Sequence, residues 1–301
     1  MSRLGIFVDR RTLSSSDQLT SLIRCRDAAE EMGHSVEFIF PVDIRKIPQM
    51  DALFIRARTD PMNITYVASR MAAFAGIPVI DDPESIQVCS DKVNMYMHLA
   101  RAGVAIPRTL FLSKGDIHPS RVRDIMDDLG TPLVLKEPST SFSLRVERVE
   151  DPAAFIRVAR RYLKMSDWVV AQEYVQSTYD WRIGVLRGRF LYACKYIIPS
   201  QTFKIQDSVN GHVVYCAVES VPPDAVPAPI RDLGVAAGKA IGDGLYGVDI
   251  KDGKEPKVIE VNDNPSIDAG VEDLYLGEDL YRRIMAEFLD RLERKRLGLA
   301  D

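Results

Sequence analysis

The chain has 301 residues, of which 46% are hydrophobic and 27% are charged, so it is long enough to bury one large core or two smaller ones. Its 39 basic and 43 acidic residues are mixed along the whole length and give a formal net charge of -4. This balance argues against a surface of a single charge sign. We therefore expect neither nucleic acid nor membrane as a partner and favour a small-molecule or peptide substrate.

The cysteines and the apolar segments give no sign of export or of a membrane span. The cysteines are widely spaced without a CxxC pair, and they fall in segments expected to be helix or strand. The start, MSRLGIFVDRR, lacks the apolar core of a signal peptide, and no later stretch approaches the roughly 20 apolar residues of a membrane span. We therefore expect a cytoplasmic protein whose thiols are free and buried, at Cys25, Cys89, Cys194 and Cys216.

The first part of the chain alternates between strand and helix patterns, which predicts a mostly parallel sheet. The turn after its first strand, DRRTLSSS, lacks the glycines that let a backbone approach a pyrophosphate. A Rossmann-type oxidoreductase that binds NAD is therefore a disfavoured alternative. The expected strands are 4–8, 36–40, 52–57 and 77–81, with a helix that starts at SSSDQ and ends at Gly33 and another over 65–76.

A second unit begins near Ser90 and becomes richer in strand from residue 168 onward. Its segments WRIGVL and RFLYACKYI are joined by Arg187 and Gly188, a pair suited to a hairpin turn, so the later sheet is expected to be antiparallel. The expected helices are SDKVNMYMHLARAG, 120–129, 227–241 and a charged amphipathic helix from about 278 to 296. The expected strands before residue 168 are RTLFL and PLVLKEP.

The strongest chemical signal is a predicted hairpin in which YGVDI and KVIEV flank the polar turn KDGKEP. Residues two apart in a strand point to the same face, so Glu260 and Asn262 should face together, with Asp249 across the hairpin. Oxygen ligands of these kinds suit magnesium that is shared with nucleotide phosphates. The alternative is a solvated edge hairpin. The residues expected on the buried opposite face are Val248, Ile250, Ile259 and Val261.

The segment VIEVNDNPSIDAGVED resembles the closing motif of ATP-grasp ligases, particularly the RimK-like branch that includes ribosomal-protein glutamate ligases. The resemblance covers almost the whole chain, because four further segments follow the family's order: SDKVNMYMHLARAGVAIPRT, PLVLKEP, VVAQEYV and DWRIGV. It implies a combined α/β and α+β fold, the ATP-grasp fold. The implied parts are an N-terminal Rossmann-like, pre-ATP-grasp parallel-sheet domain at 1–89 and two α+β lobes that enclose the nucleotide, at 90–167 and 168–301.

The resemblance also implies contacts with ATP. Lys136 stands among apolar residues in its strand, and its ammonium group would need an anion such as a phosphate if it were buried. By resemblance Lys136 and Lys92 contact the phosphates, although Lys92 could be an ordinary surface lysine. Asp180 is expected at the ribose, with a purely structural turn role as its alternative. The remaining expected contacts are the hinge backbone of Glu173, Tyr174 and Val175 at adenine and Lys204 near the phosphates.

Arg182 is the expected catalytic residue, because a strand arginine can fork onto a transferring phosphoryl group or an acyl phosphate. The alternative for Arg182 is a salt bridge to Asp180. Lys195, in the neighbouring strand, is expected to add a second positive charge. The four histidines are unclustered and receive no role.

Two residues are expected to contact substrates other than ATP. Arg56 stands at the end of a parallel strand, where α/β sheets bind ligands, and it could hold a carboxylate; Arg58 shares its face and could do so instead. Ser266, just after the metal motif, is expected near the acceptor, with a simple turn serine as the alternative.

The chain departs from many ATP-grasp enzymes in the loop after PLVLKEP, which is glycine-rich in those enzymes. Here the loop reads PSTSFSLRVERV, with hydroxyl groups at Ser139, Thr140, Ser141 and Ser143 and a guanidinium group at Arg145. These side chains could replace some phosphate contacts, but they are bulkier and less mobile than glycine. The departure bears on loop closure and on catalytic rate.

Taken together, the motifs predict an ADP-forming ligase that activates a carboxylate as an acyl phosphate and joins it to an amine. The implied cofactors are ATP and one or two Mg2+ ions, for which Mn2+ can substitute. The resemblance suggests glutamate or another amino acid as one substrate, a small molecule, peptide or protein as the acceptor, and a homo-oligomer. The alternative is a catalytically degenerate ATP-binding regulatory protein, which the glycine-poor loop favours and the metal residues disfavour.

Overall fold

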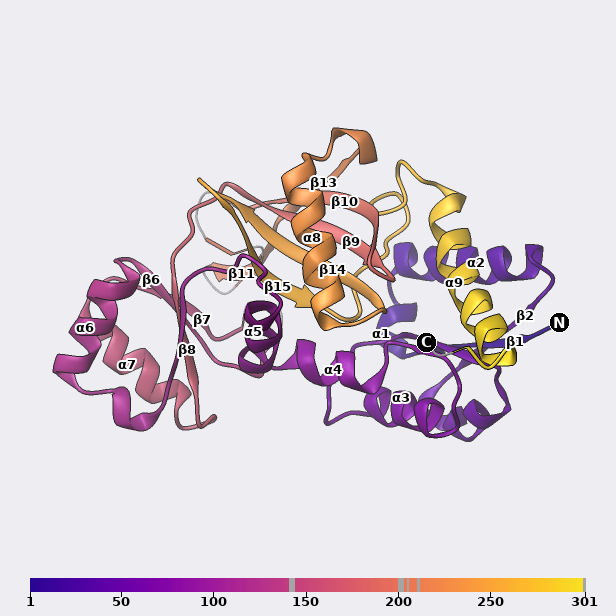
Figure 1. The fold of residues 1–301 in the computed structure, drawn as a ribbon, viewed down its shortest axis with the longest axis horizontal. Coiled ribbons are helices and arrows are strands. Elements are labelled where there is room, and N and C mark those ends of the chain that lie inside the picture. The colour runs from indigo at the N-terminus through magenta and orange to yellow at the C-terminus, as the bar shows by residue number, and fades with distance from the viewer. Residues whose placement is uncertain (141–143, 200–202, 205, 210–211, 300–301) are drawn as a thin grey trace.

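The computed structural model describes residues 1–140, 144–199, 203–204, 206–209 and 212–299. The chain forms three parts that follow one another along the long axis of the molecule (Figure 1). An N-terminal α/β part lies at one end, a part built on a five-stranded sheet lies in the middle, and a small sheet with two helices lies at the other end. Within the described residues, no helix is long and apolar enough to cross a membrane.

The N-terminal part is a four-stranded parallel sheet in the order β2-β1-β3-β4, which confirms the predicted parallel sheet. Its first long helix starts where the Ser15 side chain accepts from the Gln18 amide, and it ends just before Gly33, as the sequence predicts. The strands are β1 (Arg3–Val8), β2 (Ser35–Ile39), β3 (Ala52–Arg56) and β4 (Val79–Ile80). The helices are α1 (Arg10–Leu13), α2 (Ser16–Glu31), η1 (Pro41–Gln49), α3 (Ile64–Phe74) and α4 (Pro83–Ser90).

The small part is a four-stranded antiparallel sheet in the order β5-β8-β6-β7, with two helices packed on it. Strand β8 comes after the expected boundary at residue 168, yet it pairs with β5 and β6. Strand β7 and helix α7 were not predicted. The elements are α5 (Lys92–Arg101), which leads in, then β5 (Thr109–Leu112), η2 (Lys114–Asp116), α6 (Pro119–Leu129), β6 (Leu133–Lys136), β7 (Val146–Val149), α7 (Pro152–Tyr162) and β8 (Val169–Glu173).

The central part is an antiparallel sheet in the order β13-β10-β9-β14-β15. Arg187 and Gly188 join β9 to β10 with φ of 47° and 62°, and two positive φ values are typical of the tight turn whose twist matches a hairpin. The predicted hairpin is therefore confirmed. The strands are β9 (Tyr179–Leu186), β10 (Arg189–Ile197), β11 (Gln206–Val209), β12 (His212–Tyr215), β13 (Ala217–Val221), β14 (Leu245–Asp252) and β15 (Pro256–Asn262), and the helices are η3 (Pro223–Ala225), α8 (Ala228–Ile241) and α9 (Glu278–Arg296).

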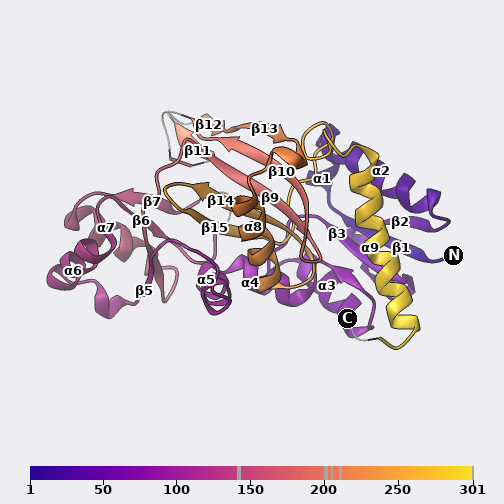
Figure 2. The same cartoon turned by 45° about the horizontal axis from the view of Figure 1, so that its top comes forward.

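The two faces of the central sheet pack against different parts of the chain. One face, with Ile183, Val185 and Val248, forms a core with α8 and α5. Toward the N-terminal part the other face, with Tyr192, Cys194 and Leu245, joins a core that includes β1 and α2. Helix α9 returns to the N-terminal part and packs along α2 (Figure 2). The second face therefore lies at the junction between the two parts.

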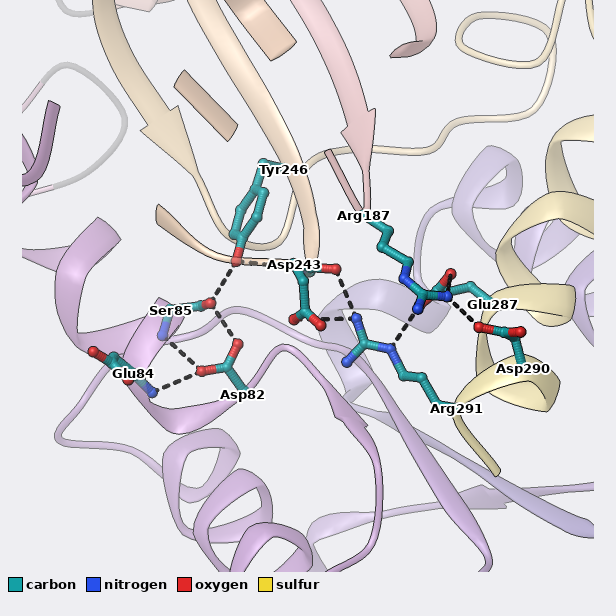
Figure 3. A network of polar contacts seen from close by, with 10 residues as sticks. Asp82, Glu84, Ser85, Arg187, Asp243, Tyr246, Glu287, Asp290 and Arg291 are labelled. Atoms are coloured by element: carbon teal, nitrogen blue, oxygen red, sulfur yellow. Dashed lines mark hydrogen bonds and ion pairs between the residues drawn. The ribbon is translucent and has the colours of Figure 1, made fainter. Parts of the chain in front are cut away.

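A polar network fixes helices α4 and α9 to the central sheet (Figure 3). The Ser85 hydroxyl on α4 lies 2.7 Å from the Tyr246 hydroxyl on β14. On α9, Arg291 donates to Glu287 at 2.8 Å and to the carbonyl of Asp243 at 2.6 Å. Because both arginine contacts are largely buried, they hold the last helix close to the start of β14.

The four cysteines carry free thiols, as predicted. Cys25 and Cys194 are buried, whereas Cys89 and Cys216 are only partly buried. Burial raises the pKa of the Cys25 thiol to about 12, so this thiol stays protonated at neutral pH.

Candidate active site

A one-residue bulge in the β14–β15 hairpin decides which of its side chains share a face. Ile250 pairs with Val258, but the next pair is Asp249 with Glu260, so Ile259 has no opposite partner. An uninterrupted register would place Asp249 opposite Ile259, and Glu260 would then point to the other face. The bulge therefore brings the two carboxylates to the same side of the sheet.

Asn262 lies on the same face, opposite Gly247, and its Nδ2 is 3.3 Å from Asp249 Oδ2. The structure thus brings the three expected metal-binding side chains together. The expected opposite face needs one correction: Ile259 is the bulged residue and is only partly buried, whereas Val258 takes the buried place. The burial of Asp249, which is 4% exposed, argues against a solvated hairpin, although β15 is the outer strand of its sheet.

Arg182 on β9 lies directly opposite Asp249 and binds it through both branches of the guanidinium group. Its Nε lies 2.5 Å from Oδ1 and its Nη2 lies 3.0 Å from Oδ2. The guanidinium carbon also lies 4.8 Å from the centre of the Tyr196 ring. Burial opposes the charged form, but the Asp249 carboxylate outweighs it and raises the pKa of Arg182 well above its usual value. The Arg182 guanidinium group therefore stays charged.

Asp180 does not pair with Arg182, so that alternative from the sequence is wrong. Its carboxylate instead accepts from Lys251 Nζ at 2.6 Å, and Lys251 lies opposite Asp180 on the same two strands, two residues along from Asp249 and Arg182. Burial raises the pKa of Asp180, and the Lys251 charge opposes that rise. Lys251 was missed from sequence, although its position two residues after Asp249 places it on the same strand face.

Lys136 on β6 is 5% exposed, and its Nζ donates to the Tyr96 hydroxyl at 2.9 Å. Burial lowers the pKa of the Lys136 ammonium to about 8, and the nearby Glu260 carboxylate partly opposes this. A bound anion would stabilise the charged form further. The environment therefore suits a phosphate, as the strand pattern suggested.

Lys92 stands at the start of α5 and is buried, so the alternative of an ordinary surface lysine is wrong. Its Nζ donates to the carbonyl of Thr140 and lies 4.0 Å from Glu260 Oε1. The capping residue Asp91 also accepts from the Ser139 hydroxyl at 3.2 Å. These contacts tie the start of the serine-containing loop to α5.

The rest of that loop is described in part. Ser141 and Ser143 lie outside the described residues. Arg145, where a glycine was expected, has a φ of 51°, a left-handed conformation that glycine adopts more readily. Its Nη1 lies 3.9 Å from Glu137 Oε2.

Comparison with solved structures identifies the fold. D-alanine–D-alanine ligase from Bacillus anthracis has a TM-score of 0.71 at 18% identity, with 99% of each chain covered. The same enzyme in complex with ATP gives 0.70 at 19% identity, with 99% of each chain covered. A RimK domain ATP-grasp protein from Sphaerobacter thermophilus gives 0.66 at 18% identity, with 95% of this chain and 98% of that chain covered. This chain has the ATP-grasp fold.

Sequence relatives agree with the RimK-like resemblance. A probable alpha-L-glutamate ligase 1 from Shewanella denitrificans is 27% identical over 282 residues, which cover 86% of this chain and 90% of the relative. A probable alpha-L-glutamate ligase from Vibrio parahaemolyticus is 25% identical over 300 residues, which cover 93% and 94%. No family model matches the chain. The resemblance of this ATP-grasp chain to the RimK-like ligases is therefore confirmed.

At the junction between the lobes of the ATP-grasp fold, Glu173 already has protein partners. Its carboxylate accepts from Arg108 at 2.8 Å and from Lys257 at 2.6 Å, and its amide donates to the carbonyl of Arg108 at 2.9 Å. Although burial raises the pKa of Glu173, these two cations lower it below its usual value. Tyr174 packs edge-on against Phe203, with ring centroids 6.2 Å apart. A contact between this backbone and adenine remains a prediction.

The third hinge residue, Val175, and the lysine expected near the phosphates, Lys204, have different surroundings. Val175 Cγ1 lies beside Gly253 in the β14–β15 turn, 3.2 Å from where a Cβ on that glycine would stand. Lys204 Nζ lies 5.4 Å from the centre of the Phe203 ring. The nucleotide contacts assigned to Val175 and Lys204 also remain predictions.

Lys195 is not brought to the Arg182 side of the sheet. On β10 it lies opposite Trp181, whereas its neighbour Cys194 lies opposite Arg182, and successive residues of a strand point to opposite faces. Its Nζ sits 4.7 Å from the ring centre of Tyr179 and 4.9 Å from that of Trp181. We therefore leave Lys195 out of the proposed site.

Arg56 reaches from the end of β3 to the loop that follows β15. Its guanidinium group donates to the side-chain oxygen of Asn264 at 2.6 Å and to the carbonyl of Pro265 at 2.9 Å. Arg58 is exposed, and which of the two arginines meets a substrate carboxylate stays a prediction. Ser266 is partly buried, and its carbonyl accepts from the Tyr192 hydroxyl at 3.1 Å.

Two buried carboxyl groups at the same junction were missed from sequence. Asp81 follows β4 and is 2% exposed, and Asp263 directly follows Asn262 and is 8% exposed. Among the described residues, Oδ2 of each has no hydrogen-bond partner. Burial raises the pKa of Asp263 to about 7 and that of Asp81 well above its usual value. The only sequence signal was that Asp263 lies inside the recognised motif.

The donors on the β14–β15 face fit a divalent cation that is shared with phosphates. Within the described part of the chain, no three His, Cys, Asp or Glu side chains are grouped so that they could hold a metal by themselves. Asp249 and Glu260 supply carboxylates, and Asn262 adds an amide oxygen. Each carboxylate oxygen has two lone pairs, so Asp249 can accept from Arg182 and still bind a cation. Magnesium usually takes one or two carboxylates and completes its shell with water and phosphate.

Proposed function

We propose that the protein is an ATP-dependent carboxylate-amine ligase that forms an amide or peptide bond through an acyl phosphate. The observation that carries the proposal is the shared face of Asp249, Glu260 and Asn262 in an ATP-grasp fold, with Arg182 on the adjacent strand. Lys136, from the small sheet, is buried close enough to Glu260 to interact electrostatically. Opposite charges from two parts of the chain thus meet where a nucleotide phosphate would lie.

The two lysines bind and neutralise phosphate in this proposal. Lys136 is buried and its Nζ donates to a neutral oxygen, that of Tyr96, so an anion would stabilise its charge strongly. Lys92 is held between Glu260 and the Thr140 carbonyl, which keeps its ammonium group at the edge of the metal face. Both positions are fixed before a nucleotide binds.

Arg182 stabilises the charge that develops during phosphoryl transfer. Its pair with Asp249 uses Nε and Nη2, which orients the guanidinium plane and leaves Nη1 as a further donor. A group that is oriented in advance needs no reorganisation during the reaction. Asp249, Glu260 and Asn262 would hold a magnesium ion, which would supply positive charge to the phosphates.

The reaction then has two steps. The substrate carboxylate attacks the γ-phosphorus of ATP, and ADP leaves as the acyl phosphate forms. The amine attacks the acyl carbon, and inorganic phosphate leaves with the electron pair of the bond that breaks. The protein contributes position and electrostatics, because a carboxylate and an amine are themselves nucleophiles.

Glutamate is the amino acid we favour as one substrate, and the acceptor is a small molecule, peptide or protein. The support is the name shared by the two sequence relatives. Arg56 is the residue we assign to a substrate carboxylate, because it stands at the ligand-binding edge of the N-terminal sheet and joins the loop after the metal motif. Ser266, in that loop, is assigned to the acceptor side.

A regulatory protein that binds ATP without turnover is the second candidate. Lys92 already donates to the Thr140 carbonyl, and Arg145 occupies the place of a glycine in the loop after β6. Both features favour a loop that closes poorly over phosphates. The complete oxygen-ligand set on β14 and β15 favours the ligase.

The experiment mixes the protein with ATP, magnesium and pools of amino acids and short peptides, and follows ADP, phosphate and condensed products by mass spectrometry. Asp249→Asn and Glu260→Gln serve as matched controls, because each keeps the side-chain shape and removes one charge. ADP release that requires an added carboxylate and amine and is lost in both variants supports the ligase. Tight ATP binding without ADP from any pool would support the regulatory protein instead.

A further inference from the structure

The hydroxyl group of Tyr96, on α5, contacts both strand β6 and strand β15. Tyr96 lies on α5 and is 1% exposed. Its hydroxyl accepts from Lys136 Nζ at 2.9 Å and donates to the carbonyl of Ile259 at 2.6 Å. Gln172 Oε1, on β8, lies farther away at 3.3 Å. A hydroxyl has one proton, so the shorter contact to Ile259 is its donor bond.

Ile259 is the bulged residue that sets the face of Glu260. Within the β14–β15 pairing it has no opposite partner, and its carbonyl receives the Tyr96 proton. On the far side of Glu260, the amide of Val261 lies 3.2 Å from the sulfur of Met95, the residue before Tyr96. Two successive residues of α5 therefore hold the backbone on either side of Glu260.

We propose that Tyr96 is a positioning residue that couples the phosphate lysine to the metal face. This inference rests on the proposed function. Its hydroxyl fixes Lys136 on one side and the bulge at Ile259 on the other. Loss of the hydroxyl leaves the partly buried Ile259 carbonyl and the buried Lys136 ammonium without this partner. Relaxation of the bulge then moves Glu260 away from Asp249, so metal binding and nucleotide binding weaken together.

The test uses the Tyr96→Phe variant of the full chain, which keeps the ring. Mn2+ affinity is measured by electron paramagnetic resonance at a saturating non-hydrolysable ATP analogue, and nucleotide affinity is measured by calorimetry in the presence of EDTA. We expect both affinities to fall, with a loss of Mn2+ affinity of about tenfold, the lower end of outer-shell effects on metal sites. Unchanged Mn2+ affinity in Tyr96→Phe would overturn the proposal.

Two further variants separate positioning from general stability. Tyr246→Phe removes another buried hydroxyl, which lies 2.7 Å from that of Ser85, and should lower the melting temperature without changing Mn2+ affinity. Lys136→Gln keeps the Tyr96–Ile259 bond, so it should weaken nucleotide binding and leave Mn2+ affinity within twofold. If Lys136→Gln lost as much Mn2+ affinity as Tyr96→Phe, Tyr96 would act through Lys136 alone and the coupling would be refuted.

The wild-type protein distinguishes failure of this inference from failure of the proposed function. If wild type binds neither the ATP analogue nor Mn2+, or if Asp249→Asn leaves Mn2+ affinity unchanged, the site itself is misassigned and both proposals fall. If wild type binds both and Tyr96→Phe leaves Mn2+ affinity unchanged, the site assignment stands and the proposed role of Tyr96 is wrong.

Discussion

Arg182 and Asp249 lie opposite each other on neighbouring strands and form two parallel hydrogen bonds, Nε to Oδ1 at 2.5 Å and Nη2 to Oδ2 at 3.0 Å. Both side chains are buried. The same carboxylate belongs to the face that we assign to a metal ion, so one interaction orients the arginine and one of the ligands together. We therefore expect that even a substitution that keeps the charge of Arg182 will disturb the orientation of this pair.

Arg182→Lys should lower kcat by about a hundredfold while the KM for ATP changes little, because lysine cannot form the two-branched contact that fixes the cation's direction. Steady-state kinetics with the substrates found by mass spectrometry measure both constants. Lys251→Arg is the matched control on the same strand face and should retain most of the activity if direction at Arg182 is what matters. Equal losses in the two variants would contradict this assignment.

Gly247→Ala should displace Arg182. A Cβ at Gly247 would stand 2.9 Å from Arg182 Cδ and 2.8 Å from Pro265 Cβ, closer than real carbon atoms approach. We expect kcat to fall at least tenfold, since a small misplacement of a catalytic group has a large effect on rate. Gly115→Ala, where the nearest atom would be 3.7 Å away, should leave the rate unchanged. A fully active Gly247→Ala would mean that Arg182 needs no fixed position.

ATP binding should weaken as pH rises through about 8. Burial lowers the pKa of Lys136 to about 8, so the protein without nucleotide loses this positive charge above that pH. ATP binding above that pH is then coupled to uptake of a proton by Lys136. Calorimetric titrations between pH 7 and pH 9.5, in two buffers of different ionisation enthalpy, measure the affinity and the proton uptake. Lys136→Met should bind ATP weakly at every pH without uptake. Proton uptake that persists in Lys136→Met would assign the titration to another group.

Glu272→Gln should change how stability depends on pH. Glu272 is 4% exposed, and burial raises its pKa from 4.5 to about 7. The folded state therefore holds a proton that the unfolded state releases between these values, so the stability from this group is complete below pH 4.5 and is lost as pH rises through 7. The maximum effect is roughly 3 kcal/mol. Urea unfolding at pH 5 and pH 8 should show a smaller pH-dependent fall in Glu272→Gln than in wild type.

Glu255→Gln provides the control for that comparison, because Glu255 is exposed in the turn of the β14–β15 hairpin. The stability of Glu255→Gln should depend on pH in the same way as that of wild type. An equal fall in wild type and Glu272→Gln would assign the pH dependence to other buried acids.

The sequence predicted most elements because their signals are local. The helix at 278–296 and the turn at Arg187 and Gly188 appear where hydrophobic period and turn residues placed them. Strand β7 was missed because it is a short edge strand without a buried run, and helix α7, which follows it, was missed as well. Helix α4 was also missed, because it follows β4 directly and shares Asp91 at its end with α5.

The sequence by itself determined the order of the elements, the two-strand motif with Asp249, Glu260 and Asn262, and the lysine within β6, because these depend on residue type and on periods of two or 3.6 residues. Only the tertiary structure decided that Ile259 is bulged, that Asp249 and not Asp180 pairs with Arg182, that Lys92 is buried and that Lys195 faces away. The physical reason is register. A shift of one residue reverses the face of every later side chain in a strand, and register is fixed by contacts from elsewhere, such as the bond from Tyr96 to Ile259.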